Sequence, residues 1–195
     1  MKYTGFTSKT AENTQFGAGM LVFNLDNPKK FAGDLGSAII AGATEGGASL
    51  TEEIEMLDVY DGLDGYDMPV KEAQKITKRT AKMAFTVKEL SKEMLMKAMV
   101  AADLVEKGDD PYETIQPRTE IKSTDFAKNM CLLAPMLSTG EPVIVEFDNP
   151  MNTNGVNLTV AKDSPGGLEL EIQAFGTLEA YEKVPYRIHY PAKNE

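Results

Sequence analysis

The chain contains no tryptophan, one histidine and one cysteine among its 195 residues. With Cys131 alone, no disulfide can form within the chain. Its neighbours Met130, Leu132 and Leu133 are apolar, whereas a nucleophilic thiol needs a polar partner that lowers its pKa. We therefore expect Cys131 to be a buried thiol of the core.

Groups that could form a catalytic or metal site are also scarce. His189 lies in a terminal strand-like run, without a serine, cysteine or second metal ligand near it in the sequence. The aspartates Asp61, Asp64 and Asp67 are spaced by three, whereas a calcium loop needs Asp-x-Asp-x-Asp-Gly and a distal glutamate. We predict no catalytic residue, no metal and no cofactor.

Positive charge is in deficit, because 30 acidic residues oppose 20 basic ones and the formal net charge is -10. Any encounter with nucleic acid is then governed by repulsion rather than by counterion release, which argues against tight nucleic-acid binding. The N-terminus lacks the apolar run of a signal peptide, and no stretch approaches the ~20 apolar residues of a membrane span. We expect a soluble protein that is not exported by the secretory route and has no membrane partner.

The length suits one domain, residues 1–195. Residues 1–19 are rich in Thr, Ser, Asn and Gly with little periodicity, which predicts an extended arm. The cluster Gly42-Ala-Thr-Glu-Gly-Gly47 lacks the Lys-Ser/Thr of a P-loop and precedes a period-two pattern rather than a helix, so it predicts a lead-in to a strand.

Residues 49–87 predict a long hairpin, because apolar residues alternate with polar ones on both sides of a turn rich in Asp and Gly. At about 3.3 Å per residue its arms would reach about 30 to 50 Å, so part of it should project or pair with another subunit.

Residues 91–107 predict the one helix, which Ser91 would cap and Gly108 would end. Residues 109–125 read as a loop, and 127–190 contain further strand-like runs joined as hairpins. The expected fold class is α+β and mainly β, built on antiparallel sheet with one flanking helix.

Three strand-like runs turn acidic residues away from their apolar face, which suggests one anionic sheet surface or simply a solvated sheet. The acidic residues concerned are Glu53, Glu55, Glu146, Glu169 and Glu171. Basic residues gather on the return arm of the hairpin; if they share the acidic face, they weaken its charge. They are Lys71, Lys75, Lys78, Arg79 and Lys82.

Several short motifs occur in a characteristic order between about residues 15 and 190. They are Gln15-Phe-Gly-Ala-Gly19, Val22-Phe-Asn24, the glycine cluster leading into Glu52-Glu-Ile-Glu55, Asp61-Gly62, Lys88-Glu-Leu90, 121–129, Val143-Ile-Val145, Asp148-Asn149, Leu158 and Val184-Pro-Tyr-Arg-Ile188. Each is weak alone, but their order and spacing resemble the tail tube (major tail) proteins of tailed bacteriophages.

The resemblance implies a β-sandwich or rolled barrel, six copies joined edge to edge as a ring, and rings stacked into a hollow tube that conducts DNA without binding it specifically. It also implies tape-measure and tail-tip or terminator proteins as partners, and a place in the virion tail after assembly in the host bacterial cytoplasm. The five glutamates would face the lumen. The hairpin would contact neighbouring subunits through Asp61, Gly62, Asp64, Gly65, Lys71, Lys75 and Arg79.

Three alternatives stay open at this point. The chain could be a tail terminator, the tube protein of a phage-derived injection device, or a soluble ligand-binding β-domain. Rings that do not stack would favour the terminator, and an apolar pocket would favour the ligand-binding domain.

Overall fold

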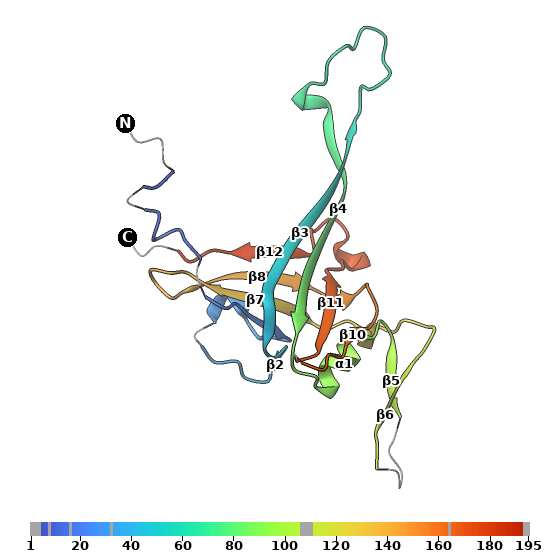
Figure 1. The fold of residues 1–195 in the computed structure, drawn as a ribbon. Helices are drawn as coiled ribbons and strands as arrows, with labels where there is room; N and C mark the ends of the chain where they lie inside the picture. Colours follow the sequence, from blue (N-terminus) through green and yellow to red (C-terminus); the bar gives the residue numbers. More distant parts are fainter. Residues whose placement is uncertain are drawn as a thin grey trace.

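The computed structural model describes residues 5–7, 9–15, 17–31, 33–105, 111–163 and 165–192. These residues form mostly antiparallel β-structure with one α-helix, so the expected fold class is confirmed. Figure 1 shows a body of two sheets, from which one long hairpin rises and a shorter one descends. No sheet closes into a barrel within the described part of the chain, so of the two expected architectures the sandwich is the one that forms.

The first sheet has five strands in the order β12-β8-β7-β1-β2. Both its faces carry core residues, which explains why buried residues follow each other directly in β7 (Asn129, Met130 and Cys131) and in β8 (Ile144 and Val145). Its strands are β1 (Met20–Phe23), β2 (Ile39–Ile40), β7 (Asn129–Pro135), β8 (Pro142–Asp148) and β12 (Tyr186–His189).

The second sheet has the order β10-β11-β4-β3, and a short strand, β9, also pairs with β11. Its two longest strands form the expected hairpin, which begins at Thr44 rather than at residue 49. The strands are β3 (Thr44–Asp58), β4 (Gln74–Val87), β9 (Met151–Asn152), β10 (Asn157–Thr159) and β11 (Gly167–Gln173).

The two sheets pack face to face around the main core. Phe23 and Phe147 from the first sheet meet Met83, Leu170 and Ile172 from the second, and each is at most 2% exposed. At about 25 cal/mol per Å² of apolar surface removed from water, the burial of these side chains stabilises the subunit.

A second, smaller core lies on the other face of the first sheet. Val22, Cys131 and Ile144 are buried there under the loop between β1 and β2, which contains the short 3-10 helix η1 (Pro28–Lys30). The remaining 3-10 helices are η2 (Lys71–Ala73), η3 (Ser123–Asp125) and η4 (Leu178–Ala180).

The helix is much shorter than predicted. Helix α1 (Lys92–Ala98) is capped by Ser91, as expected, but Met99 takes an extended conformation and ends it. The next residues form β5 (Ala102–Val105), which pairs with β6 (Thr114–Pro117), so the prediction of a helix over 91–107 and a loop over 109–125 is wrong there. Residues 106–110, including Gly108, lie outside the described part of the chain.

Contacts formed only in the fold explain why the chain leaves the helix. Arg118 donates from Nε to Asp103 at 2.9 Å and also bonds Asp125, which fixes β5 and β6 to η3. Asn152 is fully buried and donates to the Ala98 carbonyl at 2.5 Å, which satisfies an orphan group at the helix end. The spacing of apolar residues in the sequence does not predict these hydrogen-bond partners.

Of the expected arm over residues 1–19, the described parts form turns between Thr7 and Asn13 and one bridge from Gln15 to Met136. Residues 1–4, 8 and 16 lie outside the described ranges.

Candidate functional site

The outward face of the second sheet carries most of the acidic residues selected from the sequence. In the β3–β4 register, Glu53 lies opposite Thr80 and Glu55 opposite Lys78. In the β4–β11 register, Glu169 lies opposite Thr86, and Glu171 lies opposite Ala84. Because residues directly opposite share a face, four of the five predicted glutamates lie on one surface, away from the core residues Met83 and Phe85.

Glu146 does not belong to this surface. It lies on β8 of the first sheet, opposite Cys131, and its side chain is only 12% exposed. His189 Nε2 and Arg187 Nε lie 2.8 and 3.3 Å from its Oε2 atom. The expectation that three strands share one acidic surface is therefore wrong for Glu146, because alternation fixes the face of a strand but not the sheet to which the strand belongs.

Two lysines of the return arm share the acidic face, which is the arrangement expected to weaken its charge. Lys82 Nζ lies 3.5 Å from carboxylate oxygens of both Glu171 and Glu53, and these charges raise the pKa of Lys82. Lys78 pairs with Glu55 at 3.0 Å. With Glu45 and its partner Lys88 included, five glutamates oppose three lysines, so the face keeps a net charge of 3 - 5 = -2.

The base of the hairpin is tied to the first sheet. Glu52 accepts a hydrogen bond from the Tyr186 hydroxyl at 2.6 Å and pairs with Arg79 at 3.1 Å. The bond to Glu52 raises the pKa of Tyr186. Arg79 was predicted to contact a neighbouring subunit; within its own subunit it pairs with Glu52, and the contact with a neighbour stays a prediction.

Beyond this base the hairpin exposes an unusual amount of apolar surface for a soluble monomer. Met56 and Met68 are 66% and 76% exposed. The other exposed apolar residues of the distal hairpin are Ile54, Leu57, Val59, Tyr60, Leu63, Val70 and Ile76.

The tip of the hairpin, residues 58–74, is held in one shape by its own hydrogen bonds. Asp58 accepts from the Tyr66 hydroxyl and from Gln74, both at 2.8 Å, and the Tyr66 oxygen accepts from the Val70 amide at 2.9 Å. Desolvation raises the pKa of Asp58, but these hydrogen bonds and one from the Tyr60 amide together hold it below its ordinary value.

Two glycines permit the turns of this tip. Gly62 and Gly65 have φ values of 84° and 79°, a region that other residues adopt only with strain. The aspartates between and beside them, Asp61, Asp64 and Asp67, are exposed and form an acidic rim. The sequence predicted the turn glycines and the exposed aspartates of the tip, but not the hydrogen bonds of Asp58. Its partners Tyr66 and Gln74 lie eight and 16 residues away and come close only in the folded turn.

Both edges of the second sheet are open within the described chain. Strand β3 forms one edge along its 15 residues, and β10 with β9 forms the other. A long open edge presents unpaired backbone groups and favours pairing with another chain.

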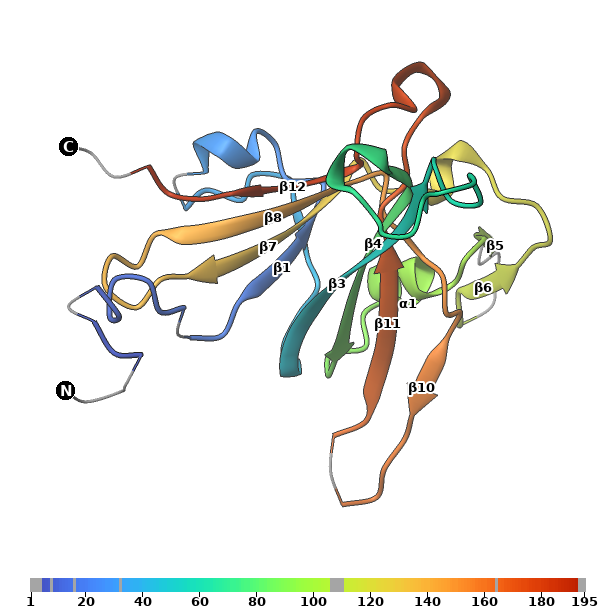
Figure 2. The ribbon, with the colours of Figure 1, turned by 90° about the horizontal axis from the view of Figure 1, so that it is seen from above.

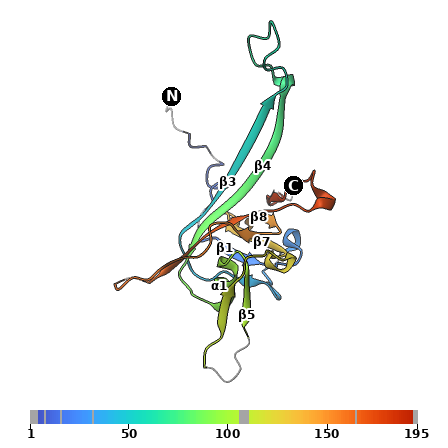
Figure 3. The same cartoon turned by 90° about the vertical axis from the view of Figure 1, so that its right-hand side faces the viewer.

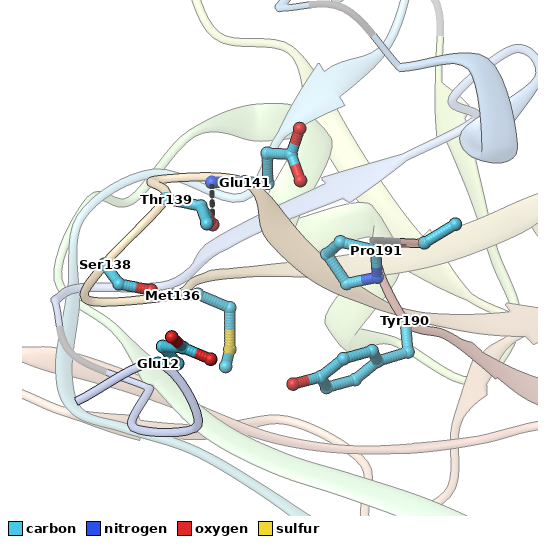
Figure 4. Close-up of a pocket in the computed structure, with 8 residues that line it drawn as sticks. Glu12, Met136, Ser138, Thr139, Glu141, Tyr190 and Pro191 are labelled. Atoms are coloured by element: carbon cyan, nitrogen blue, oxygen red, sulfur yellow. Dashed lines mark hydrogen bonds between the residues drawn. The ribbon is translucent and has the colours of Figure 1, made fainter. Parts of the chain in front are cut away.

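The surface of the body contains hollows. Figure 4 shows one of about 480 Å³ between the β7–β8 turn and the C-terminal segment, lined by Met136, Ser138, Thr139 and Tyr190 among others. Among the described residues, no group of three or more His, Cys, Asp or Glu side chains could hold a metal ion. No helix in the same residues is long and apolar enough to cross a membrane.

Cys131 should react with thiol reagents only after unfolding. It is fully buried, and this burial raises its pKa to about 12. At pH 8 the thiolate fraction is then lower by on the order of a thousandfold than for an ordinary thiol. We expect negligible labelling by iodoacetamide in native conditions and complete labelling in urea, measured by mass spectrometry. Rapid native labelling would show that the core around β7 opens.

No protein-family model and no curated protein matches the chain. Among solved structures, a chain from the virion of a native gene transfer agent particle matches with a TM-score of 0.40 and 11% identity, over 81% of this chain and 92% of that chain. A chain from the tail of an empty particle of the same kind, refined with C6 symmetry, matches with a TM-score of 0.39 and 10% identity, over 89% and 95% of the two chains. Superpositions this loose carry no conclusion about function.

Proposed function

We propose that this chain is a structural subunit of a phage or phage-like tail tube, in which six copies form a ring and stacked rings enclose a channel for DNA. The observation that carries the proposal is the second sheet, which combines two open edges with an uncovered acidic face. The order of sequence motifs that resembles tail tube proteins supports the number six and the place in a virion tail.

The strand directions allow edge-to-edge closure. Each strand of the order β10-β11-β4-β3 is antiparallel to its neighbour, so the edge strands β10 and β3 run in opposite directions. Rotation about a ring axis preserves these directions, and β3 of one copy can therefore add to β10 of the next as an antiparallel pair. Such a head-to-tail interface repeats until the ring closes, and closure covers the open edges that β3 and β10 form in the second sheet.

The resulting channel has a suitable size. Six copies of four strands give 6 × 4 = 24 strands. At about 4.8 Å per strand the circumference is about 115 Å, and the tilt of closed barrels widens it. After side chains are subtracted, a duplex about 20 Å across still fits.

The acidic face would then line this channel. Glu53, Glu55, Glu169 and Glu171 would face the lumen, while Glu146 would not. DNA carries about one negative charge per 1.7 Å, so a wall with net negative charge repels it and lets it slide. The repulsion acts over about 8 to 10 Å at physiological salt.

The distal hairpin would join successive rings. Asp61, Gly62, Asp64, Gly65, Lys71 and Lys75 are exposed at or near its tip. Lys71 pairs there with its sequence neighbour Glu72, and Arg79 pairs with Glu52 at the base of the hairpin. The tape-measure, tail-tip and terminator proteins would be further partners in the virion tail.

Negative-stain electron microscopy of the purified protein tests the proposal. We expect sixfold rings and hollow tubes, because open edges and exposed apolar surface favour association. A chain that stays monomeric at every concentration, even with tail-tip or tape-measure proteins present, would contradict the proposal. Rings that never stack would instead indicate a terminator.

A further inference from the structure

The hairpin tip has the properties of a preformed docking element. Its shape is fixed by the bonds of Asp58 and Tyr66, so little conformational entropy is lost when it binds. Leu63 and Met68 are exposed at its surface, and each is next in the sequence to an exposed aspartate, Asp64 and Asp67 respectively. A matching receptor would have an apolar floor and a basic border.

One groove on the body combines apolar side chains with a lysine at its edge. It lies between η1 and the strands β8 and β12, has a volume of about 630 Å³, and contains Pro28, Phe31, Ile144 and Ile188 on its apolar walls. Lys29 lines it as well, and Glu141 and His189 also contribute to it.

Lys29 on the border of this groove is followed in the sequence by Lys30, and the two form the only adjacent pair of lysines in the chain. Lys29 and Lys30 are both exposed, and neither forms an ion pair within 4 Å among the described residues. Nearby Lys128 is already paired with Asp26 at 2.6 Å. The lysine pair is therefore available to carboxylates from another molecule.

The direction of the hairpin favours this receptor over the acidic sheet face. Figures 2 and 3 show that the hairpin leans, as it rises, toward the layer that contains β8 and β12 and away from the outward face of the second sheet. The tip also stands well clear of its own body, so it cannot fill the groove of its own subunit (Figure 1). In a stack of copies, the tip of one subunit reaches toward the body of a subunit in the next ring.

We propose that the hairpin tip of one subunit docks into the η1–β12 groove of a second copy in the adjacent ring. Leu63 and Met68 enter the apolar floor, and Asp61, Asp64 and Asp67 pair with Lys29 and Lys30 at its border. Charge complementarity sets the register, and the buried apolar contact supplies the affinity. The proposal rests on the stacked-ring function and names the surface through which stacking occurs.

A charge swap tests the pairing. The tip variant D61K/D64K/D67K and the groove variant K29E/K30E should each form rings but lower the yield of tubes by about tenfold or more, because like charges then face each other. Tubes should return when the two sets of changes are combined in one chain. The control E179K/E182K, which reverses exposed charges on the η4 loop, should stack normally. Normal tubes from either charge variant, or no recovery in the combination, would overturn the proposal.

Cysteine crosslinking tests the contact without relying on visible tubes. Subunits carrying Leu63→Cys are mixed with subunits carrying Lys29→Cys under mild oxidation, in which the buried Cys131 stays inert. We expect a disulfide-linked dimer from this mixture and none when Lys183→Cys replaces Lys29→Cys. Rings without this crosslink would refute the docking site alone, whereas a crosslink without rings would contradict the proposed function and leave the contact intact.

Discussion

Deleting residues 61–68 should give a subunit that folds normally and forms no tubes. The deleted segment makes its side-chain hydrogen bonds within the tip, to Asp58 and Val70, and contributes nothing to the main core. We expect the free energy of unfolding to change by less than about 1 kcal/mol, as for other changes far from a core. Sedimentation and electron microscopy should show rings or single subunits instead of tubes.

A matched pair of substitutions separates the length of the hairpin from its surface chemistry. L63S/M68S keeps the tip and removes its exposed apolar groups, so we expect it to impair stacking as the deletion does. L178S changes a residue that is 94% exposed on the η4 loop, and it should have no effect on assembly. Tubes of normal length from the deletion variant would refute any role of the hairpin in stacking.

The hairpin could be predicted from the sequence because its signal is local. Alternation with period two, a turn rich in Asp and Gly, and the absence of helical spacing all agree over residues 49–87. The alternation of apolar and polar residues also predicted that Glu53, Glu55, Glu169 and Glu171 point away from the core, and the strand register confirms this.

The features that failed depend on pairing between distant segments. Glu146 follows the same alternation as Glu171, yet its strand pairs with β7 and β12, which places it beside Arg187 and His189. The helix expected over 91–107 ends at Ala98, because the residues that follow form β5 and pair with β6, a strand that lies beyond residue 110. The sequence of a single chain does not show which distant strands pair with each other.

The ion pairs on the outward face of the second sheet reduce the repulsion between its glutamates. Lys82 is held between Glu53 and Glu171, so neighbouring carboxylates are kept apart by a cation instead of repelling each other directly. The remaining charge is negative but modest, at -2 per subunit by the count above. Such a surface can hold a regular sheet together and still repel a polyanion, whereas an unrelieved row of glutamates would destabilise the sheet.

Reversing the charge of the proposed wall should make the tube retain DNA. In the variant E53K/E55K/E169K/E171K each change adds two positive charges, so the subunit moves from -10 to -10 + 8 = -2 and a ring of six from -60 to -12. The new lysines face the lumen, where they would exchange counterions for phosphate contacts. We expect DNA to sediment with the tubes at 50 mM salt and to be released at 200 mM, and we expect genome delivery by the assembled particle to slow.

Position, rather than total charge, should decide this result. The control D34K/E120K/E179K/E182K gives the same net charge with four exposed carboxylates that lie away from the second sheet, and its tubes should not retain DNA in the channel. New lysines beside Lys78 and Lys82 place like charges next to each other in the sheet, which destabilises it. The variant E53Q/E55Q/E169Q/E171Q removes the negative charge without adding positive charge, and we expect it to retain DNA more weakly than the lysine variant does. Equal retention by wall and control variants, or unchanged delivery by the wall variant, would show that the second sheet does not line the path of the DNA.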